Sequence, residues 1–600
     1  MLSITCLPTA HEEIALRIQP LSFVKMITLT RLSQKYLLPV TRGYLRIASP
    51  VTVLSAKLHS STSFQLELRN IDSNSVVKSP LPDVRVPEIN LYNHVFRDAA
   101  LFGKKIAIVN GETGREYSFA EVEEATCRVS SALNRSGLQK GDVLTLVAPN
   151  SPEYAILFLA TLASGGIVST SNPNFTDEEL AYQFKNSVSK MIATVPSALP
   201  TVQKAAERVG IEKIIVLDTT GIGDSKHISY RSLVEDTGSR FSPASVNAKD
   251  DIAVLPYSSG TTGFPKGVML THFSVVANMC QLEHPQLFDF RQDGVCLMGL
   301  LPFFHIYGMA VILFTSMHSG SKVISLPKFD GDTFLTAIQK YRINILHLAP
   351  PLALFLAKHP SVDKYDTSSI DQVVSGGAPL SGELVTAVRE RLGCRLVRQL
   401  YGLTETSPVT HVVPEMLGMT KPNSIGIPVR NMEVKIVDTK SLENLPVGQE
   451  GEVWMRGPNI MKGYLNLPDA TKFSITEDGW FRTGDIGYFD EEGCFYITDR
   501  LKELIKVKGF QVAPAELEAL LQNHPKIADA AVVGIPNERL GEAPRAFVVK
   551  KDPNVTEEEI VNYVASKVTK HKHLVGGVEF IEAVPKSPSG KILRRMLRKK

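Results

Sequence analysis

Residues 257–272 combine the groups needed to hold a polyphosphate. The segment reads Tyr-Ser-Ser-Gly-Thr-Thr-Gly-Phe-Pro-Lys-Gly-Val-Met-Leu-Thr-His and contains five hydroxyl-bearing Ser and Thr side chains and three glycines. Glycine lets backbone N–H groups approach and wrap an anion, hydroxyl groups add donors, and Lys266 adds positive charge. A Walker A loop requires Gly-Lys-Ser/Thr, whereas Gly267 and Val268 follow the lysine here.

Four further segments place polar and charged residues between apolar runs. They are Gln399-Leu-Tyr-Gly-Leu-Thr-Glu-Thr-Ser-Pro-Val409, Gly479-Trp-Phe-Arg-Thr-Gly-Asp485, residues 499–516 (beginning Asp-Arg-Leu-Lys) and Pro585-Lys-Ser-Pro-Ser-Gly-Lys591. In this order, together with the first segment, they resemble the signature motifs of the adenylate-forming superfamily, which includes acyl-CoA synthetases, peptide-synthetase adenylation domains and beetle luciferases. The resemblance spans residues 85–600. Residues 302–308, Pro-Phe-Phe-His-Ile-Tyr-Gly, and the form of segment 499–516 are most similar to 4-coumarate:CoA ligases and their luciferase-like relatives.

The resemblance implies an ATP-dependent acid:CoA ligase that forms an acyl-adenylate and then a CoA thioester. The expected small molecules are ATP, Mg²⁺, coenzyme A and an aromatic (4-coumarate-like) or fatty carboxylic acid. In the first step a carboxylate attacks the α-phosphorus of ATP, so two anions must be aligned and their charge screened. By resemblance, Glu405 binds the metal, and Lys591 binds the attacking carboxylate and the α-phosphate. The basic residues behind it, Arg594, Arg595, Arg598, Lys599 and Lys600, are expected to form a solvated face.

The same resemblance assigns the nucleotide contacts. The residues implied are Ser258, Ser259, Gly260, Thr261, Thr262, Gly263 and Lys266 at the β- and γ-phosphates; Gly377, Ala378, Pro379, Gln399, Tyr401 and Gly402 in the segments beside the adenine; Thr404 at phosphate; and Asp485 and Arg500 at the ribose.

The second half-reaction requires a different surface, because CoA must reach the acyl-adenylate. The resemblance implies rotation of a small C-terminal domain about a hinge at Lys502. Lys506, Lys508, Gly509 and Gln511 would then face the site, with Lys506 and Gln511 at positions that promote thioester formation. Gly509 would let the pantetheine thiol pass close to the backbone.

The acyl group is expected beside an aromatic run. His305 would gate or line the acyl channel by resemblance, and positions near the acyl group match Asn278, Tyr307, Gly377, Gly402, Pro408 and Val409. Several of these residues are small, which indicates room for an aromatic or extended tail. Leu400 departs from the Gly common in relatives and is expected to narrow the pocket beside the nucleotide or the acyl group.

Residue patterns predict an α/β fold with a large N-terminal domain, an antiparallel subdomain and a small α+β C-terminal domain, and the resemblance implies that this small domain is mobile. In residues 91–500, strand-like runs such as 143–148 and 214–218 alternate with helical patterns such as 153–163, which favours parallel sheets flanked by helices. Gly and Asp turns between 430 and 500 indicate antiparallel strands. Residues 501–600 predict helices at 513–521 and 557–567 and strands at 529–535 and 546–549. Residues 67–90 are polar and Pro-rich and are interpreted as a lead-in.

Bulk composition excludes several classes of protein. The formal net charge is +3 over 600 residues. Residues 1–66 hold a net charge of +5, so the remainder is nearly neutral and gives no reason to expect nucleic-acid binding. Six scattered cysteines without a Cys-x-x-Cys pair argue against a disulfide framework or zinc site and favour a reducing compartment. No run of 18 apolar residues occurs, so no transmembrane helix is expected.

The N-terminal segment resembles a targeting sequence. Residues 14–66 contain no Asp or Glu and are rich in Arg, Lys, Ser, Thr and Leu. From Met26, Leu29, Leu32 and Tyr36 fall on one helical face. These features predict a mitochondrial transit peptide over residues 1–66. The alternatives are a disordered extension or a true start at Met26, and a cytoplasmic or peroxisomal protein, although the chain ends in Arg-Lys-Lys rather than Ser-Lys-Leu.

Three other functions share the adenylation motifs. A luciferase-like oxidoreductase would oxidise the adenylate with oxygen, and a carrier-loading enzyme would pass the acyl group to a partner protein's pantetheine arm. A catalytically inactive binding protein is the third, and the intact lysines argue against it.

Overall fold

The computed structural model describes residues 70–217, 226–258, 265–418, 420–507, 510–587 and 590–598, without the side chains of residues 510, 511 and 595. The predicted leader at 1–66, the loop residues Ser259, Gly260, Thr261, Thr262 and Gly263, and Lys508 and Gly509 lie outside the described residues, as does the side chain of Gln511.

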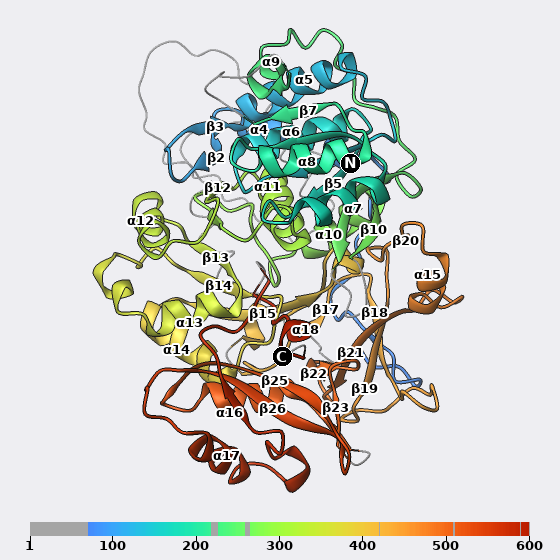
Figure 1. Cartoon of the computed structure of the whole chain (residues 1–600). Coiled ribbons are helices and arrows are strands. Elements are labelled where there is room, and N and C mark those ends of the chain that lie inside the picture. The colour runs from blue at the N-terminus through green and yellow to red at the C-terminus, as the bar shows by residue number, and fades with distance from the viewer. Residues whose placement is uncertain are drawn as a thin grey trace, which may run out of the picture. The chain divides into compact units, whose positions relative to one another are not determined.

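An eight-stranded sheet forms the first part of the large domain (Figure 1). Its strands, in spatial order, are β20 (Gly463–Tyr464), β10 (Lys266–Thr271), β9 (Ile252–Ser258), β5 (Ile167–Ser171), β4 (Val143–Val147), β6 (Ser189–Thr194), β7 (Ile214–Val216) and β8 (Ile228–Ser229). Strands β9 to β8 pair in parallel, and β4 is buried along its whole length, as a central parallel strand must be. Helices α6 (Pro152–Ala163), α7 (Asp177–Ser187) and α8 (Leu199–Val209) pack on this sheet, and α5 (Phe119–Arg135) packs against α6.

A nine-stranded sheet forms the second part. Its strands are β17 (Ile427–Pro428), β16 (Val409–Val412), β15 (Leu396–Gly402), β14 (Gln372–Ser375), β13 (Ile345–Leu348), β11 (Cys296–Gly299), β12 (Lys322–Ser325), β2 (Ile106–Asn110) and β3 (Glu116–Ser118). One face packs on α12 (Gly331–Tyr341), α13 (Pro350–Lys358) and α14 (Gly382–Leu392) in one apolar cluster.

A shared core joins the two sheets. It contains α6, α10 (His272–Leu282) and the π-helix η1 (Tyr307–Phe314), packed with inward residues of both sheets such as Leu144 and Val374. The carboxyl ends of β14 and β15 reach this core next to η1. Shorter described helices complete the domain: α3 (Leu91–Val95), α4 (Ala99–Phe102), α9 (Tyr230–Val234), α11 (Thr315–Ser319), α15 (Pro468–Ser474) and the 3-10 turns η2 (Pro360–Lys364), η3 (Thr404–Thr406) and η4 (Glu415–Leu417).

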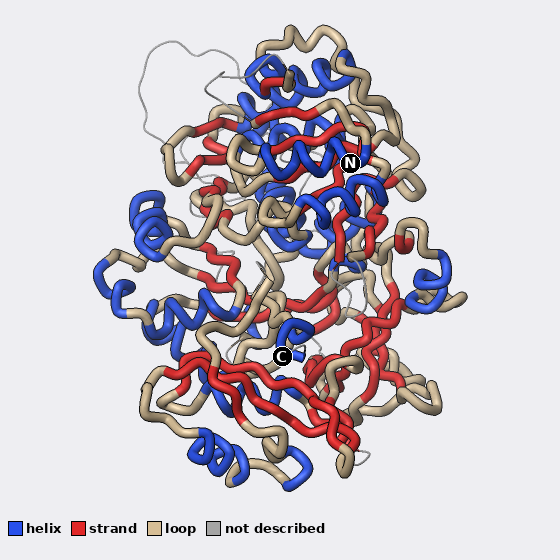
Figure 2. Tube along the Cα trace, viewed as in Figure 1, coloured by secondary structure: helices blue, strands red, loops and turns tan. Residues whose placement is uncertain are grey.

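Two smaller sheets follow, and Figure 2 shows their strands in red. The antiparallel sheet contains β1 (Val77–Lys78), β18 (Glu433–Val437), β19 (Gly451–Arg456), β21 (Phe481–Phe489) and β22 (Phe495–Arg500). The C-terminal sheet contains β24 (Phe510–Val512), β23 (Ile505–Val507), β26 (Gly541–Lys550), β25 (Ile527–Asn537) and β27 (Val578–Phe580). Its helices are α16 (Pro514–Gln522), α17 (Glu557–Ala565), the 3-10 turn η5 (Lys570–Lys572) and α18 (Arg594–Arg598).

The sequence predictions of these elements are confirmed, with small shifts in their ends. The strand predicted at 546–549 is the second half of β26, because β25 and β26 extend into a long hairpin that apolar periodicity alone does not delimit. The helix predicted at 557–567 ends at Ala565. Within the described residues, the five cysteines are free thiols and no helix is long and apolar enough to cross a membrane.

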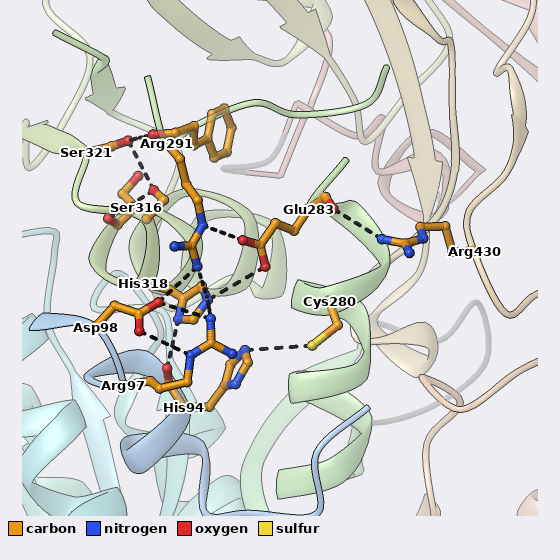
Figure 3. A network of polar contacts seen from close by, with 12 residues as sticks. His94, Arg97, Asp98, Cys280, Glu283, Arg291, Ser316, His318, Ser321 and Arg430 are labelled. Carbon is orange, nitrogen blue, oxygen red and sulfur yellow. Dashed lines mark hydrogen bonds and ion pairs between the residues drawn. The ribbon is translucent and has the colours of Figure 1, made fainter. Parts of the chain in front are cut away.

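A polar network fixes the carboxyl end of α10 (Figure 3). The Arg291 guanidinium pairs with the carboxylates of Glu283 and Asp98, and Asp98 also pairs with Arg97. His318 lies beneath them, and its Nδ1 donates to the carbonyl oxygen of His94 at 2.8 Å. The network joins α10 to α3 and α11, so it holds the helix that carries Asn278.

Candidate active site

Two ends of the predicted phosphate loop converge on Glu405. Ser258 and Lys266 are paired across β9 and β10 on either side of residues 259–264. Ser258 Oγ donates to Glu405 Oε1 at 3.0 Å, and the Tyr464 hydroxyl donates to the same oxygen at 2.9 Å. Lys266 Nζ lies 4.7 Å from the centre of the Tyr464 ring. Tyr464 therefore positions both the carboxylate and the lysine, and no local motif around it in the sequence identified this role.

The chemistry of Glu405 fits a magnesium ligand. Within the described residues, both side-chain hydrogen bonds to this carboxylate reach Oε1, and no described side chain bonds Oε2. A carboxylate oxygen is a hard ligand of the kind that Mg²⁺ prefers. Thr404 precedes Glu405 in η3, so the two predicted phosphate and metal contacts begin one short turn.

Tyr401, Asp485 and Arg500 form one connected group. The Tyr401 hydroxyl donates to Asp485 Oδ2 at 2.6 Å, and Arg500 Nε pairs with Asp485 Oδ1 at 2.9 Å. Asp485 and Arg500 are opposite each other in β21 and β22, so strand register sets this ion pair. The Asp485 carboxylate raises the pKa of Arg500. The sequence assigned these residues to adenine and ribose, and the structure brings all three together.

Gln399 holds the loop that follows β14. Its Oε1 accepts from the backbone N–H of Leu380 at 2.8 Å, and its Nε2 donates to the carbonyl oxygen of Pro422 at 2.7 Å. The loop contains Gly377, Ala378 and Pro379, with Gly377 at φ +88°. Gln399 therefore acts on the predicted adenine wall through this backbone.

Lys591 reaches the site from the C-terminal domain. Burial, and then the charge of Arg500, lower the pKa of the ammonium to about 8, while Glu503, Asp485 and Glu405 oppose the shift. The preceding residue docks the loop: a Cβ on Gly590 would lie 3.0 Å from Ala349 Cβ, at the start of α13. The backbone of Lys591 is held by Ser587, whose Oγ accepts from its N–H at 3.1 Å.

His305 lies within electrostatic reach of Lys591. Burial, and then the charge of Lys591, lower the pKa of His305 to about 4, so the imidazole is neutral at pH 7. Its Nδ1 accepts from the backbone N–H of Tyr307 at 3.3 Å, which places the ring proton on Nε2. A neutral N–H donor beside an ammonium suits an anionic oxygen placed between them.

Asn278 forms two hydrogen bonds with the backbone of the predicted acyl wall. Its side-chain Nδ2 donates to the carbonyl oxygen of Val409 at 2.6 Å, and its Oδ1 accepts from the N–H of Val409 at 3.1 Å. A Cβ on Gly402 would lie 2.0 Å from the carbonyl oxygen of Pro408, so this turn requires glycine. Asn278 thus positions Pro408 and Val409.

Comparison with known proteins identifies the family. The AMP-binding enzyme model matches residues 95–465, and the model for the AMP-binding enzyme C-terminal domain matches residues 516–591. The chain belongs to the AMP-binding enzyme family. This confirms the predicted α/β fold class and the prediction of an adenylate-forming ligase.

Relatives of known name match nearly their full length. A probable 4-coumarate–CoA ligase 1 of Dictyostelium discoideum is 40% identical over 535 residues, which is 87% of this chain and 97% of the relative. A 4-coumarate–CoA ligase 2 of Petroselinum crispum is 43% identical over 533 residues, with 88% and 96% covered. The ATP-bound crystal structure of MatB from Rhodopseudomonas palustris has a TM-score of 0.75 and 29% identity, with 85% of this chain and 98% of that chain covered.

Of the residues assigned to thioester formation, Lys506 lies in strand β23 and Gln511 in strand β24. Lys506 is exposed and is paired with Gln511 of β24 in backbone register. Its N–H donates to Glu542 Oε2 at 2.7 Å. Lys502 is exposed in the turn that follows β22. A hydrogen bond connects the segments before and after this turn, because Asp499 Oδ2 accepts from the N–H of Ala515 in α16 at 3.2 Å.

One expectation about the C-terminal end is wrong. Arg594 is not part of a solvated basic face, because its side chain is 10% exposed and forms ion pairs with Glu503 and Glu518. Burial raises the pKa of Glu518 to about 7, and the Arg594 charge opposes that shift. The two carboxylates are 76 and 91 residues away in sequence, so no local pattern indicates that they neutralise this arginine.

Proposed function

We propose that the chain is an ATP-dependent acid:CoA ligase that forms an acyl-adenylate and then transfers the acyl group to coenzyme A. The observation that supports it most is the position of Lys591. This residue of the C-terminal domain lies within electrostatic reach of Asp485, Arg500 and Glu405, and also of His305. The 4-coumarate–CoA ligases that match nearly the whole chain support CoA as the acceptor.

Adenylation uses the cationic and donor groups around this point. The ammonium of Lys591 binds the carboxylate of the acid and the α-phosphate, and so reduces the repulsion between two anions. His305 Nε2–H donates to the same carboxylate and holds it for in-line attack. Asp485 accepts from the ribose hydroxyls, and Tyr401 covers the adenine with a flat apolar face.

Magnesium is assigned to Glu405. The ion would neutralise phosphate charge when bound. Ser258 and Lys266 hold the β- and γ-phosphates together with residues 259–263, and Ser258 also orients Glu405 through their hydrogen bond.

Thioester formation uses the strand pair β23–β24. Rotation at Lys502 would exchange Lys591 for Lys506 and Gln511, while Lys508 and Gly509 would border the pantetheine path. Asp499 holds the adenylation arrangement, because its hydrogen bond to Ala515 crosses the hinge and must break on rotation.

The decisive experiment is an acid-dependent exchange of labelled pyrophosphate into ATP, followed by product analysis with and without CoA. A panel of aromatic and fatty acids should include one that supports exchange and yields a CoA thioester and AMP. Light emission with oxygen and no thioester would instead indicate a luciferase-like oxidoreductase. Transfer only to a phosphopantetheinylated carrier protein would indicate a carrier-loading enzyme.

We also propose that residues 1–66 direct the protein to mitochondria, on the basis of their basic, acid-free, amphipathic character. A fusion of residues 1–70 to a fluorescent protein should enter mitochondria. The same fusion with Arg31, Lys35, Arg42 and Arg46 changed to Gln should stay diffuse. Diffuse signal from the unaltered fusion would contradict the proposal and favour a start at Met26.

A further inference from the structure

The geometry around Lys591 defines where the tail of the acid must run. In the proposed function the carboxylate binds at this ammonium, and His305 lies within electrostatic reach of it. His305 is joined to the start of η1, because its Nδ1 accepts from the backbone N–H of Tyr307. We therefore take the tail to run past His305 toward Tyr307. There Tyr307, at the start of η1, and Leu400, in β15, lie over Gly376, which directly follows β14.

Gly376 has no side chain, but its neighbours occupy the space above it. A Cβ built on Gly376 would lie 2.7 Å from Leu400 Cδ1 and 2.9 Å from Tyr307 Cε1. Atoms of an acyl chain or ring need about 3.5–4.0 Å to pack against carbon. A flat ring laid on Gly376 would therefore occupy the positions that Leu400 and Tyr307 already hold.

Tyr307 is held in place by polar contacts. Its hydroxyl lies 3.0 Å from His347 Nδ1 and 3.5 Å from the carbonyl oxygen of Val374. The two rings meet edge to face at 90°, with centroids 5.6 Å apart. Gly308 adds a constraint, because a Cβ there would lie 2.2 Å from the carbonyl oxygen of Pro302. The start of η1 is thus packed directly on backbone, and Tyr307 has little freedom to withdraw.

Buried side chains of strands β13, β14 and β15 fill the layer of the sheet next to Tyr307. His347, Val374 and Arg398 are paired in register across β13, β14 and β15. All three are buried, and the Arg398 guanidinium lies 4.7 Å from the centre of the Phe288 ring. Arg398 and Leu400 are two residues apart in β15 and so share one face of the sheet, which this buried row fills next to Leu400.

We propose that Leu400 closes the acyl pocket over Gly376, so that this enzyme activates short straight-chain carboxylic acids in preference to aromatic acids. The inference rests on the proposed ligase function and specifies its substrate class. A short straight chain is narrower than a cinnamate ring, so it needs less of the space over Gly376 that Tyr307 and Leu400 occupy. Leu400 is a specificity-determining residue and has no role in the chemistry.

Leu400→Ala tests this directly, and the same strand offers a matched control. Leu396 is also buried in β15 and also covers a glycine, since its Cδ1 lies 2.5 Å from where a Cβ of Gly418 would be. Leu396→Ala removes the same atoms away from the acyl path. Acid-dependent pyrophosphate exchange would be measured with acetate, butyrate, hexanoate, benzoate, cinnamate and 4-coumarate for both variants and the wild type.

We expect kcat/KM of the wild type for butyrate or hexanoate to exceed that for 4-coumarate by at least about tenfold. This is the discrimination that a pocket achieves against about one extra methylene group. Leu400→Ala should lower this ratio of the two kcat/KM values by at least about tenfold. Leu396→Ala should leave the ratio unchanged. Thermal unfolding of both variants checks that they fold, and Leu400→Val replaces the alanine variant if that one does not.

Two results would overturn the inference. One is a wild type that uses 4-coumarate as well as the short acids. The other is a folded Leu400 variant whose acid preference equals that of the wild type. Failure of the proposed function has a different signature, because no acid would then support exchange in any variant.

Discussion

The Tyr401 hydroxyl donates a 2.6 Å hydrogen bond to Asp485 and thereby joins strand β15 of the nine-stranded sheet to strand β21 of the antiparallel sheet. The two residues lie 84 positions apart in sequence. Arg500 pairs with the other oxygen of the same carboxylate. The nucleotide side of the site therefore depends on how two separate sheets are placed.

Tyr401→Phe tests this link. A hydrogen bond to a charged group contributes about 1.5–3 kcal/mol, so kcat/KM for ATP should fall by at least about tenfold. The aromatic face remains, so the loss reports the orientation of Asp485. Tyr496→Phe is the control, because its hydroxyl donates to Asp490 at 3.1 Å away from the site. Equal kinetic losses in both variants would contradict the assignment.

Lys591→Ala should abolish adenylation and leave the fold intact. Loss of a cation aimed at developing charge costs about 100-fold or more in rate, so acid-dependent pyrophosphate exchange should fall by that factor. Lys586→Ala is the matched control, since it removes a lysine of the same segment that pairs with Asp529 at 2.6 Å. Exchange at the wild-type rate in Lys591→Ala would remove this residue from the mechanism.

The pKa of Lys591 also predicts a pH profile. Burial and the nearby Arg500 lower this pKa to about 8, so the ammonium loses its proton as pH rises through about 8. Because kcat/KM for ATP reports groups of the free enzyme, it should be level below about pH 8 and decline above it. Lys591→Arg stays protonated throughout and should lack this decline at a lower overall rate. An unchanged alkaline decline in the arginine variant would assign it to another group.

Much of the secondary structure can be predicted from the sequence, because the apolar patterns that identify helices and strands lie within short segments. Strands such as β4 and helices such as α6 are buried along their whole length, so their apolar runs identify them. Motif residues such as Asp485 and Lys591, which are distant in sequence, lie within electrostatic reach of each other. Contacts made by tertiary packing were missed. Tyr464 on Glu405, and the burial of Arg594 between two carboxylates, join segments that no periodicity relates.

The two half-reactions should separate by mutation. Lys506 is exposed on β23 in this arrangement, so Lys506→Ala should leave pyrophosphate exchange largely unchanged and slow transfer of preformed acyl-adenylate to CoA. Lys502→Pro should behave similarly, because a fixed φ restricts rotation at the hinge. Paired single-turnover assays, one for each half-reaction, measure both effects. If Lys506→Ala slowed adenylation as severely as Lys591→Ala, a single fixed site would explain the data better.

The network at the end of α10 predicts an acid-sensitive contribution to stability (Figure 3). Hydrogen bonding by His318, and then the charge of Arg291, lower the pKa of Glu283 to about 2 from a usual value of 4.5. A carboxyl group whose pKa is depressed on folding stabilises the native state above its unfolded pKa, and that contribution is lost as pH falls toward the folded value. Glu283→Gln should therefore lower Tm most above about pH 4.5.

The Tm difference between wild type and Glu283→Gln should shrink as pH falls from about 4.5 toward about 2, as measured by calorimetry. Exposed Glu477→Gln is the control and should show no such dependence. The contribution matters for the site because α10 carries Asn278, which holds the backbone of Val409 through two hydrogen bonds. If the network positions that helix, Glu283→Gln should also raise KM for the acid more than KM for ATP at pH 7. An equal rise in both constants would show that the network stabilises the fold without shaping the acyl wall.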